Sequence, residues 1–128
     1  ERADMNGDTP LHRAALGGHL EAVRLLIAGA KGFDAGNKAG NTALMLAASK
    51  GQHDVGQLLV ESGAAIDLRN GQGMSALMLA ARAGADEFVG LLLAKGADRS
   101  LRNLRREQAA DIARASGHSQ LASMIGTK

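Results

Sequence analysis

The sequence predicts an all-α fold, a solenoid of stacked helix-turn-helix units joined by β-hairpin-like loops. The main observation is a repeat, because residues 9–15 (TPLHRAA) return as 42–48 (TALMLAA) and as 75–81 (SALMLAA). A weaker copy, QAADIAR, occupies residues 108–114, and every copy begins 33 residues after the previous one. A constant period of this length is typical of arrays in which each unit packs on its neighbours.

The register extends beyond this segment and divides the chain into four units. Glycines recur in phase on both sides of it, at Gly7, Gly40 and Gly73 before it and at Gly18, Gly51, Gly84 and Gly117 after it. The units open at Asp4, Asn37, Asn70 and Asn103. We therefore expect a single domain over residues 1–128, with units 4–36, 37–69 and 70–102 and a C-terminal capping unit 103–128.

The first helix of each unit has clear start and stop signals. Thr9 is a good N-cap, since its hydroxyl can accept a hydrogen bond from an unpaired backbone N–H. Pro10 takes the first helical position, where its missing N–H has no cost. Gly18 supplies the left-handed conformation that ends many helices. The sequence thus predicts a helix from Pro10 to about Gly17.

The second helix is expected over roughly residues 20–28. Ala22, Leu25 and Leu26 recur at helical spacing and predict an apolar stripe. Glu21 falls in the first turn, where the helix dipole favours a carboxylate. Isolated helices shorter than ~12–15 residues are marginal in water, so these short helices must be stabilised by stacking.

The segments between units predict tight hairpin tips. The tips fall at residues 37–40 and 70–73, which are rich in Asn and Gly and therefore tolerate positive φ. Phe33 and Ile66 are expected to anchor the loops that lead to these tips.

These residues resemble the ankyrin repeat family. Its unit has 33 residues and the signature Thr-Pro-Leu-His-x-Ala, which residues 9–14 match at every position. The Gly-His pair that opens the family's second helix recurs at Gly18-His19 and at Gly117-His118. The resemblance covers roughly residues 4–125. It implies a stack whose hairpin fingers and first helices line a concave side, with the second helices on the convex side.

The two ends of the array differ from its middle. The fourth copy has Arg106, Gln108 and Arg114 where the third has Gly73, Ser75 and Ala81. Polar replacements of this kind are expected in an end unit, which has one face without a neighbour. At the other end, Arg13 stands where Leu46 and Leu79 stand in the middle units, which fits an exposed first unit.

The sequence argues against catalysis, a metal site and a cofactor. The chain has no Cys, and we expect its four histidines (His12, His19, His53 and His118) to be structural. Met45 and Met78 replace the signature His in the middle units, and we expect them to pack in the core. The sequence contains no apolar run near the about 18 residues that span a bilayer. We expect a cytoplasmic location, with the periplasm or secretion left open.

The resemblance implies a non-catalytic protein–protein interaction module that is monomeric and binds its partner on the concave side. Family members usually touch their partners with the hairpin tips and the first-helix ends, which here are Met5, Asn6, Asp8, Lys38, Asn41, Lys50, Gln72, Met74, Arg82, Leu104 and Arg105. Several of these residues are basic although the net charge is only +2, so we expect a protein partner with an acidic segment.

Two alternatives remain open at this stage. One is a structural or engineered scaffold array with no partner of its own. The other is nucleic-acid binding through the basic C-terminal end, which the absence of Trp and Tyr disfavours because single strands are usually held by aromatic stacking.

Overall fold

The computed structural model describes residues 5–29 and 33–126, and these residues form a stack of paired α-helices. The elements in chain order are α1 (Pro10–Gly17), α2 (Leu20–Ala28), α3 (Ala43–Lys50), α4 (His53–Glu61), α5 (Ala76–Ala83), α6 (Asp86–Ala94), α7 (Ala109–Ala115) and α8 (Ser119–Ile125). Extended pairing among the described residues is limited to one isolated antiparallel bridge between Arg69 and Ser75. The all-α repeat architecture expected from the sequence is confirmed.

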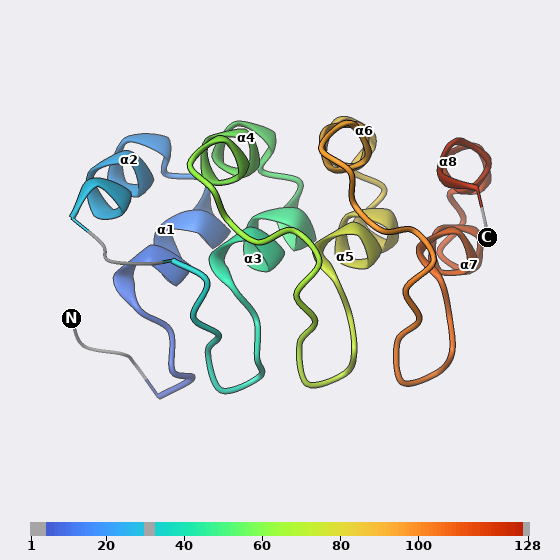
Figure 1. The fold of residues 1–128 in the computed structure, drawn as a ribbon, viewed down its shortest axis with the longest axis horizontal. Helices are drawn as coiled ribbons and strands as arrows, with labels where there is room; N and C mark the ends of the chain where they lie inside the picture. The colour runs from blue at the N-terminus through green and yellow to red at the C-terminus, as the bar shows by residue number, and fades with distance from the viewer. Residues whose placement is uncertain (1–4, 30–32, 127–128) are drawn as a thin grey trace.

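Three layers run along the stack (Figure 1). The first helices α1, α3, α5 and α7 form the middle row, and the second helices α2, α4, α6 and α8 form a row on one side of it. On the other side project the loops that precede each first helix. We call these loops the fingers and number them one to four: residues 5–9, 34–42, 67–75 and 100–108. The fingers and first helices together make up what we call the concave side.

The first helices begin and end as their sequences predict. In the second unit, Thr42 Oγ1 accepts a hydrogen bond from the Met45 N–H at 3.3 Å, and the helix ends at Gly51, whose φ of 66° is left-handed. The thioether of Met45 accepts in turn from the Thr42 N–H at 3.4 Å. In the first unit His12 Nδ1 accepts from the Thr9 N–H at 2.9 Å. Methionine therefore replaces the bulk and the capping hydrogen bond of the signature histidine, whose second ring nitrogen contacts the Ala35 carbonyl.

The core lies between the two rows of helices. Leu44 and Leu77 of the first helices are 2% and 1% exposed, and Leu59 and Leu92 of the second helices are fully buried. Met45 and Met78 are also in this core, which confirms the packing role expected for them. The prediction was wrong for Leu25, which is 75% exposed. Helix α2 buries Val23 instead. Val23 and Leu25 are two positions apart, so their side chains lie about 200° apart around the helix, on nearly opposite sides.

A glycine of one unit receives a phenylalanine of the next. A Cβ built on Gly56 of α4 would lie 2.4 Å from Cε2 of Phe88 in α6, closer than real contacts allow. Phe88 is 1% exposed, so its ring is enclosed at this position. The absence of a side chain at Gly56 thus makes room for the largest core residue of the third unit.

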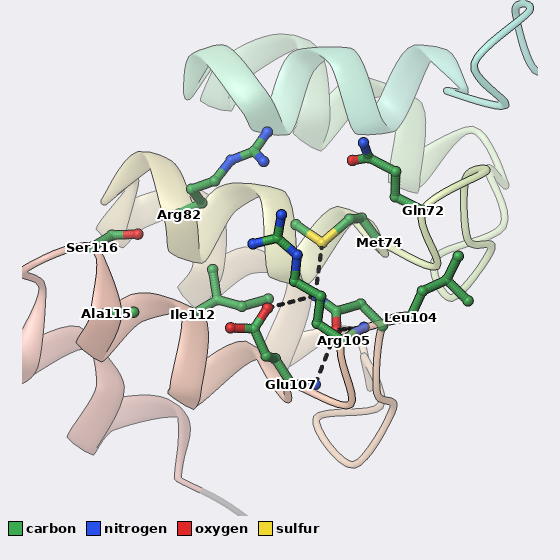
Figure 2. A pocket seen from close by; sticks show the side chains of 10 residues that line it. Gln72, Met74, Arg82, Leu104, Arg105, Glu107, Ile112, Ala115 and Ser116 are labelled. Atoms are coloured by element: carbon green, nitrogen blue, oxygen red, sulfur yellow. Dashed lines mark hydrogen bonds between the residues drawn. The ribbon is translucent and has the colours of Figure 1, made fainter.

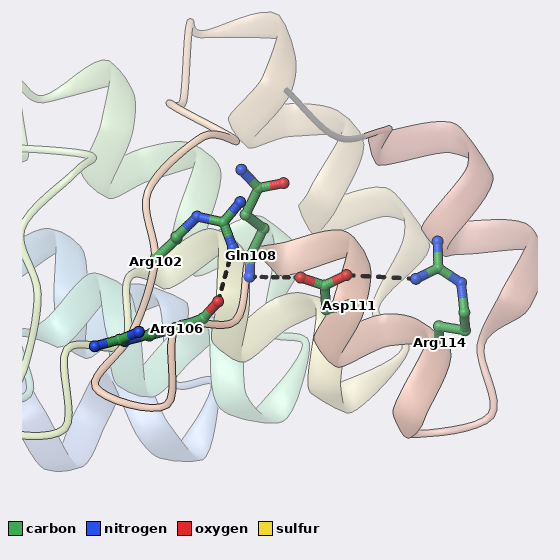
Figure 3. Close-up of polar contacts among 5 residues, drawn as sticks. All are labelled: Arg102, Arg106, Gln108, Asp111 and Arg114. Carbon is green, nitrogen blue, oxygen red and sulfur yellow. Dashed lines mark hydrogen bonds and ion pairs between the residues drawn. The ribbon is translucent and has the colours of Figure 1, made fainter.

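The last unit has a polar side chain at a position that is buried and apolar in the other three units. Arg114 is exposed at the register position where Ala15, Ala48 and Ala81 are fully buried. It lies 3.4 Å from Asp111 Oδ1, while the other carboxylate oxygen of Asp111 accepts the Gln108 N–H at 3.0 Å (Figure 3). At the opposite end Arg13 is exposed and donates to the Asp8 carbonyl at 3.1 Å. Asp4, which opens the first unit in the sequence, lies outside the described residues.

Candidate functional site

The fingers are connected to one another by backbone hydrogen bonds. Each bond runs from a tip N–H to a carbonyl of the preceding finger: Lys38 to Asn6 at 3.0 Å, Gly71 to Ala39 at 2.9 Å and Leu104 to Gln72 at 3.1 Å. The fingers approach so closely that a Cβ on Gly73 would lie 2.9 Å from the Leu104 nitrogen. The concave side is therefore built on fingers that support one another.

Asparagine side chains add a second link between neighbouring fingers. Asn37 Nδ2 donates to Asp8 Oδ1 at 2.7 Å, and Asn70 Nδ2 donates to Asn41 Oδ1 at 2.8 Å. At the third junction Asn103 Nδ2 donates to the Met74 sulfur at 3.3 Å. The register positions of Asp8, Asn41 and Met74 thus serve the stack itself, a role that the sequence analysis did not anticipate.

Among the predicted contact residues, Met74 is largely buried and leaves only an edge of its side chain accessible. Met74 is 5% exposed and packs in the core, and its sulfur accepts a hydrogen bond from Asn103 of the next finger. The remaining predicted residues lie at the surface. Lys50 and Arg82 are in the last turns of α3 and α5. Asp8 and Asn41 are half-buried in the fingers, and the other six are exposed at the finger tips: Met5, Asn6, Lys38, Gln72, Leu104 and Arg105.

A cavity of about 380 Å³ brings five of the predicted residues together on the concave side (Figure 2). It lies between the third and fourth fingers and the ends of α5 and α7, and the five are Gln72, Met74, Arg82, Leu104 and Arg105. Sequence reasoning did not select Asn103, Ile112, Ala115 and Ser116, which also line it. The repeat could have identified two of them, because Ala115 and Ser116 lie 33 residues after Arg82 and Ala83 and so occupy the same positions in the fourth unit. Met5, Asn6, Asp8, Lys38, Asn41 and Lys50 do not line this cavity.

The cavity combines two cations with one carboxylate. Arg82 and Arg105 are exposed, and neither guanidinium makes a hydrogen bond or ion pair with any residue that the structure describes. Glu107 faces the same cavity, but its Oε1 accepts from Asn103 Nδ2 at 3.0 Å rather than from an arginine. The formal charge of the three side chains is therefore +1, with both guanidiniums available to a ligand.

Other arginines near the fourth finger serve the fold. Arg69 Nη1 donates to the Arg102 carbonyl at 3.3 Å, and Arg102 Nη1 donates to the Arg106 carbonyl at 2.8 Å. Arg99 Nη1 donates to the Ile125 carbonyl at 2.8 Å. These three side chains donate to backbone carbonyls of the third and fourth units, so the basic C-terminal end seen in the sequence is not one continuous free surface.

The histidines show no arrangement that would support metal chemistry. His12 is 3% exposed, and its Nε2 is 2.8 Å from the Ala35 carbonyl, which is the loop contact expected of the signature histidine. Within residues 5–29 and 33–126 no group of His, Asp or Glu side chains is placed to hold a metal ion. In the same part of the chain no helix has both the length and the apolar character to cross a membrane.

Comparison with known families agrees with the geometry. The family described as ankyrin repeats (3 copies) matches residues 1–70 and 31–103. The chain belongs to the ankyrin repeat family. Its members are generally protein–protein interaction modules and typically have no enzymatic activity. A search among curated proteins found no match.

Proposed function

We propose that this ankyrin repeat protein is a non-catalytic interaction module that binds an acidic segment of a protein partner at the cavity between the third and fourth fingers. The observation that carries the proposal is the pair of guanidiniums, Arg82 and Arg105, which line one cavity and have no hydrogen bond or ion pair with the described residues. Arginine binds carboxylates through two parallel hydrogen bonds, a geometry that lysine cannot match.

The cavity also offers apolar contacts, which exposed charges need as a complement. Exposed ion pairs contribute only ~0.2–1 kcal/mol each, so charge alone gives weak binding. Ile112 and Met74 present small apolar edges at 5% exposure, and Leu104 is 76% exposed at the rim. A partner segment with both acidic and aliphatic residues matches this combination.

The supporting fingers favour binding for a further reason. Backbone and asparagine hydrogen bonds hold the fourth finger against the third, through Leu104 and Asn103. A preformed site loses little conformational entropy when a ligand arrives, so more of the contact energy remains as affinity.

A random-peptide display selection tests the proposal directly. We expect the protein to enrich peptides with acidic residues, and we expect the enrichment to disappear with the double variant Arg82→Glu and Arg105→Glu. The variant Arg24→Glu is the matched control, because Arg24 is an exposed arginine on α2 whose ion pair with Glu21 is a surface contact. Enrichment of the same peptides on wild type and double variant would refute binding at this cavity.

Nucleic-acid binding receives less support from the structure. The guanidiniums of Arg69, Arg99 and Arg102 are used in contacts to backbone carbonyls. The display selection and a titration with single-stranded DNA at increasing salt separate the two functions, since phosphate binding weakens steeply with salt.

A further inference from the structure

We infer that the cavity between the third and fourth fingers is a subsite for one carboxylate, an Asp or Glu side chain followed by an aliphatic residue, and that Glu107 makes it reject a phosphorylated side chain. The inference rests on the proposed function and specifies which acidic chemistry the site accepts. Two free guanidiniums by themselves would fit a phosphate as well as a carboxylate. The discrimination comes from the third charged group in the cavity.

Glu107 is held in place at the cavity and cannot easily turn away from a ligand. Its Oε1 accepts from Asn103 Nδ2 at 3.0 Å, and its backbone N–H donates to Asn103 Oδ1 at 2.9 Å. Asn103 is itself 9% exposed and is fixed by the Arg105 N–H, which also donates to its Oδ1 at 2.9 Å. The carboxylate of Glu107 is thus held at the cavity by its contacts with Asn103.

The charge of the site matches a single carboxylate. Arg82, Arg105 and Glu107 sum to +1, so one bound carboxylate brings the cavity to neutrality. A phosphorylated side chain carries about −1.5 to −2 charges at neutral pH, which leaves an excess of negative charge beside Glu107. Placing a phosphate next to a carboxylate is unfavourable because of like-charge repulsion.

The position of Glu107 also offers a contact that a peptide can use. Oε2 has no hydrogen-bond partner among the residues that the structure describes, so it can accept a backbone N–H of a bound peptide. The two arginines would then bind the carboxylate side chain of the peptide, and Glu107 would accept a hydrogen bond from the peptide backbone. The aliphatic neighbour would lie against Leu104 and the edge of Ile112.

Three end-blocked, fluorescein-labelled peptides test the inference. They differ at one position, which holds Glu, phosphoserine or Gln, and this position is followed by Leu in all three. Binding to the full chain is measured by fluorescence anisotropy at low salt. We expect the Glu peptide to bind more tightly than the Gln peptide by about two- to fivefold, as for an exposed ion pair, and more tightly than the phosphoserine peptide.

The variant Glu107→Gln isolates the role of the carboxylate. Glutamine keeps the oxygen that accepts from Asn103, so the fourth finger should remain folded, and circular dichroism checks this. We expect the phosphoserine peptide to gain about two- to fivefold in affinity and to overtake the Glu peptide. The variant Arg24→Gln, on α2, is expected to leave all three affinities unchanged.

The possible failures are distinguishable. If phosphoserine binds wild type more tightly than Glu and Glu107→Gln leaves this order and ratio unchanged, the carboxylate inference is wrong while acidic binding at the cavity stands. If the Glu and Gln peptides bind equally and neither responds to Arg82→Gln or Arg105→Gln, the proposed function at this cavity is wrong as well.

Discussion

The substitution Gly56→Ala is expected to destabilise the protein, against the usual effect of replacing glycine within a helix. Alanine in a helix interior is favoured over glycine by roughly 0.5–1 kcal/mol. Here the new Cβ would lie 2.4 Å from Cε2 and 2.5 Å from Cζ of Phe88, whose side chain is only 1% exposed. Overpacking of a core costs about 1–3 kcal/mol. Subtracting the gain from the cost leaves a net loss of up to about 2.5 kcal/mol.

Gly90 of α6 is the matched control for this prediction. A Cβ there meets nothing within 4 Å, so Gly90→Ala should stabilise the protein by roughly 0.5–1 kcal/mol. Urea denaturation followed by far-UV circular dichroism measures both effects. Leucine lacks the ring atoms that clash, so Phe88→Leu should cost less in the Gly56→Ala background than in wild type. Equal stabilisation by the two alanine substitutions would refute this account of the packing.

Three further changes should have measurable effects. Leu77→Ala, or Leu44→Ala, should cost ~2–5 kcal/mol of unfolding free energy in urea, because both leucines are buried at the centre of the stack; losses below about 1 kcal/mol for both would contradict that placement. Arg106 has a φ of 65°, which costs a side-chain-bearing residue roughly 1–2 kcal/mol, so Arg106→Gly should raise the urea midpoint. An unchanged or lower midpoint would refute this account of the strain at Arg106. Removing residues 103–128 exposes Leu79 and Leu92, and we expect aggregation in light scattering rather than a soluble, cooperatively folding monomer.

The sequence predicts α1, α3 and α5 well because the boundaries of these helices depend on local chemistry. Thr42 and Gly51 begin and end α3 through hydrogen bonds and a left-handed turn within a few residues. The buried leucines Leu44 and Leu77 occupy one register position of the repeat, and the sequence identifies this position because it is apolar in both copies. Leu25 shows the limit of this reasoning, because its register position is apolar in every copy and yet Leu25 is exposed in the first unit.

The site was harder to predict because it depends on contacts between units. Asp8, Asn41 and Met74 vary from copy to copy, as partner contacts do, yet each accepts a hydrogen bond from the asparagine of the next finger. That pairing joins residues 29 positions apart, and no local pattern signals it. Arg82 and Arg105 were selected from charge and register alone, and the structure places both at one cavity.

The backbone bonds between fingers give each junction of the array its own reporter in hydrogen exchange. The amide protons of Lys38, Gly71 and Leu104 are each bonded across a different junction. Their exchange rates therefore measure how often neighbouring units separate, junction by junction, without any substitution. Local opening free energies within one protein range from near zero to the global value. A ligand that spans the third and fourth fingers should slow exchange at Leu104 most.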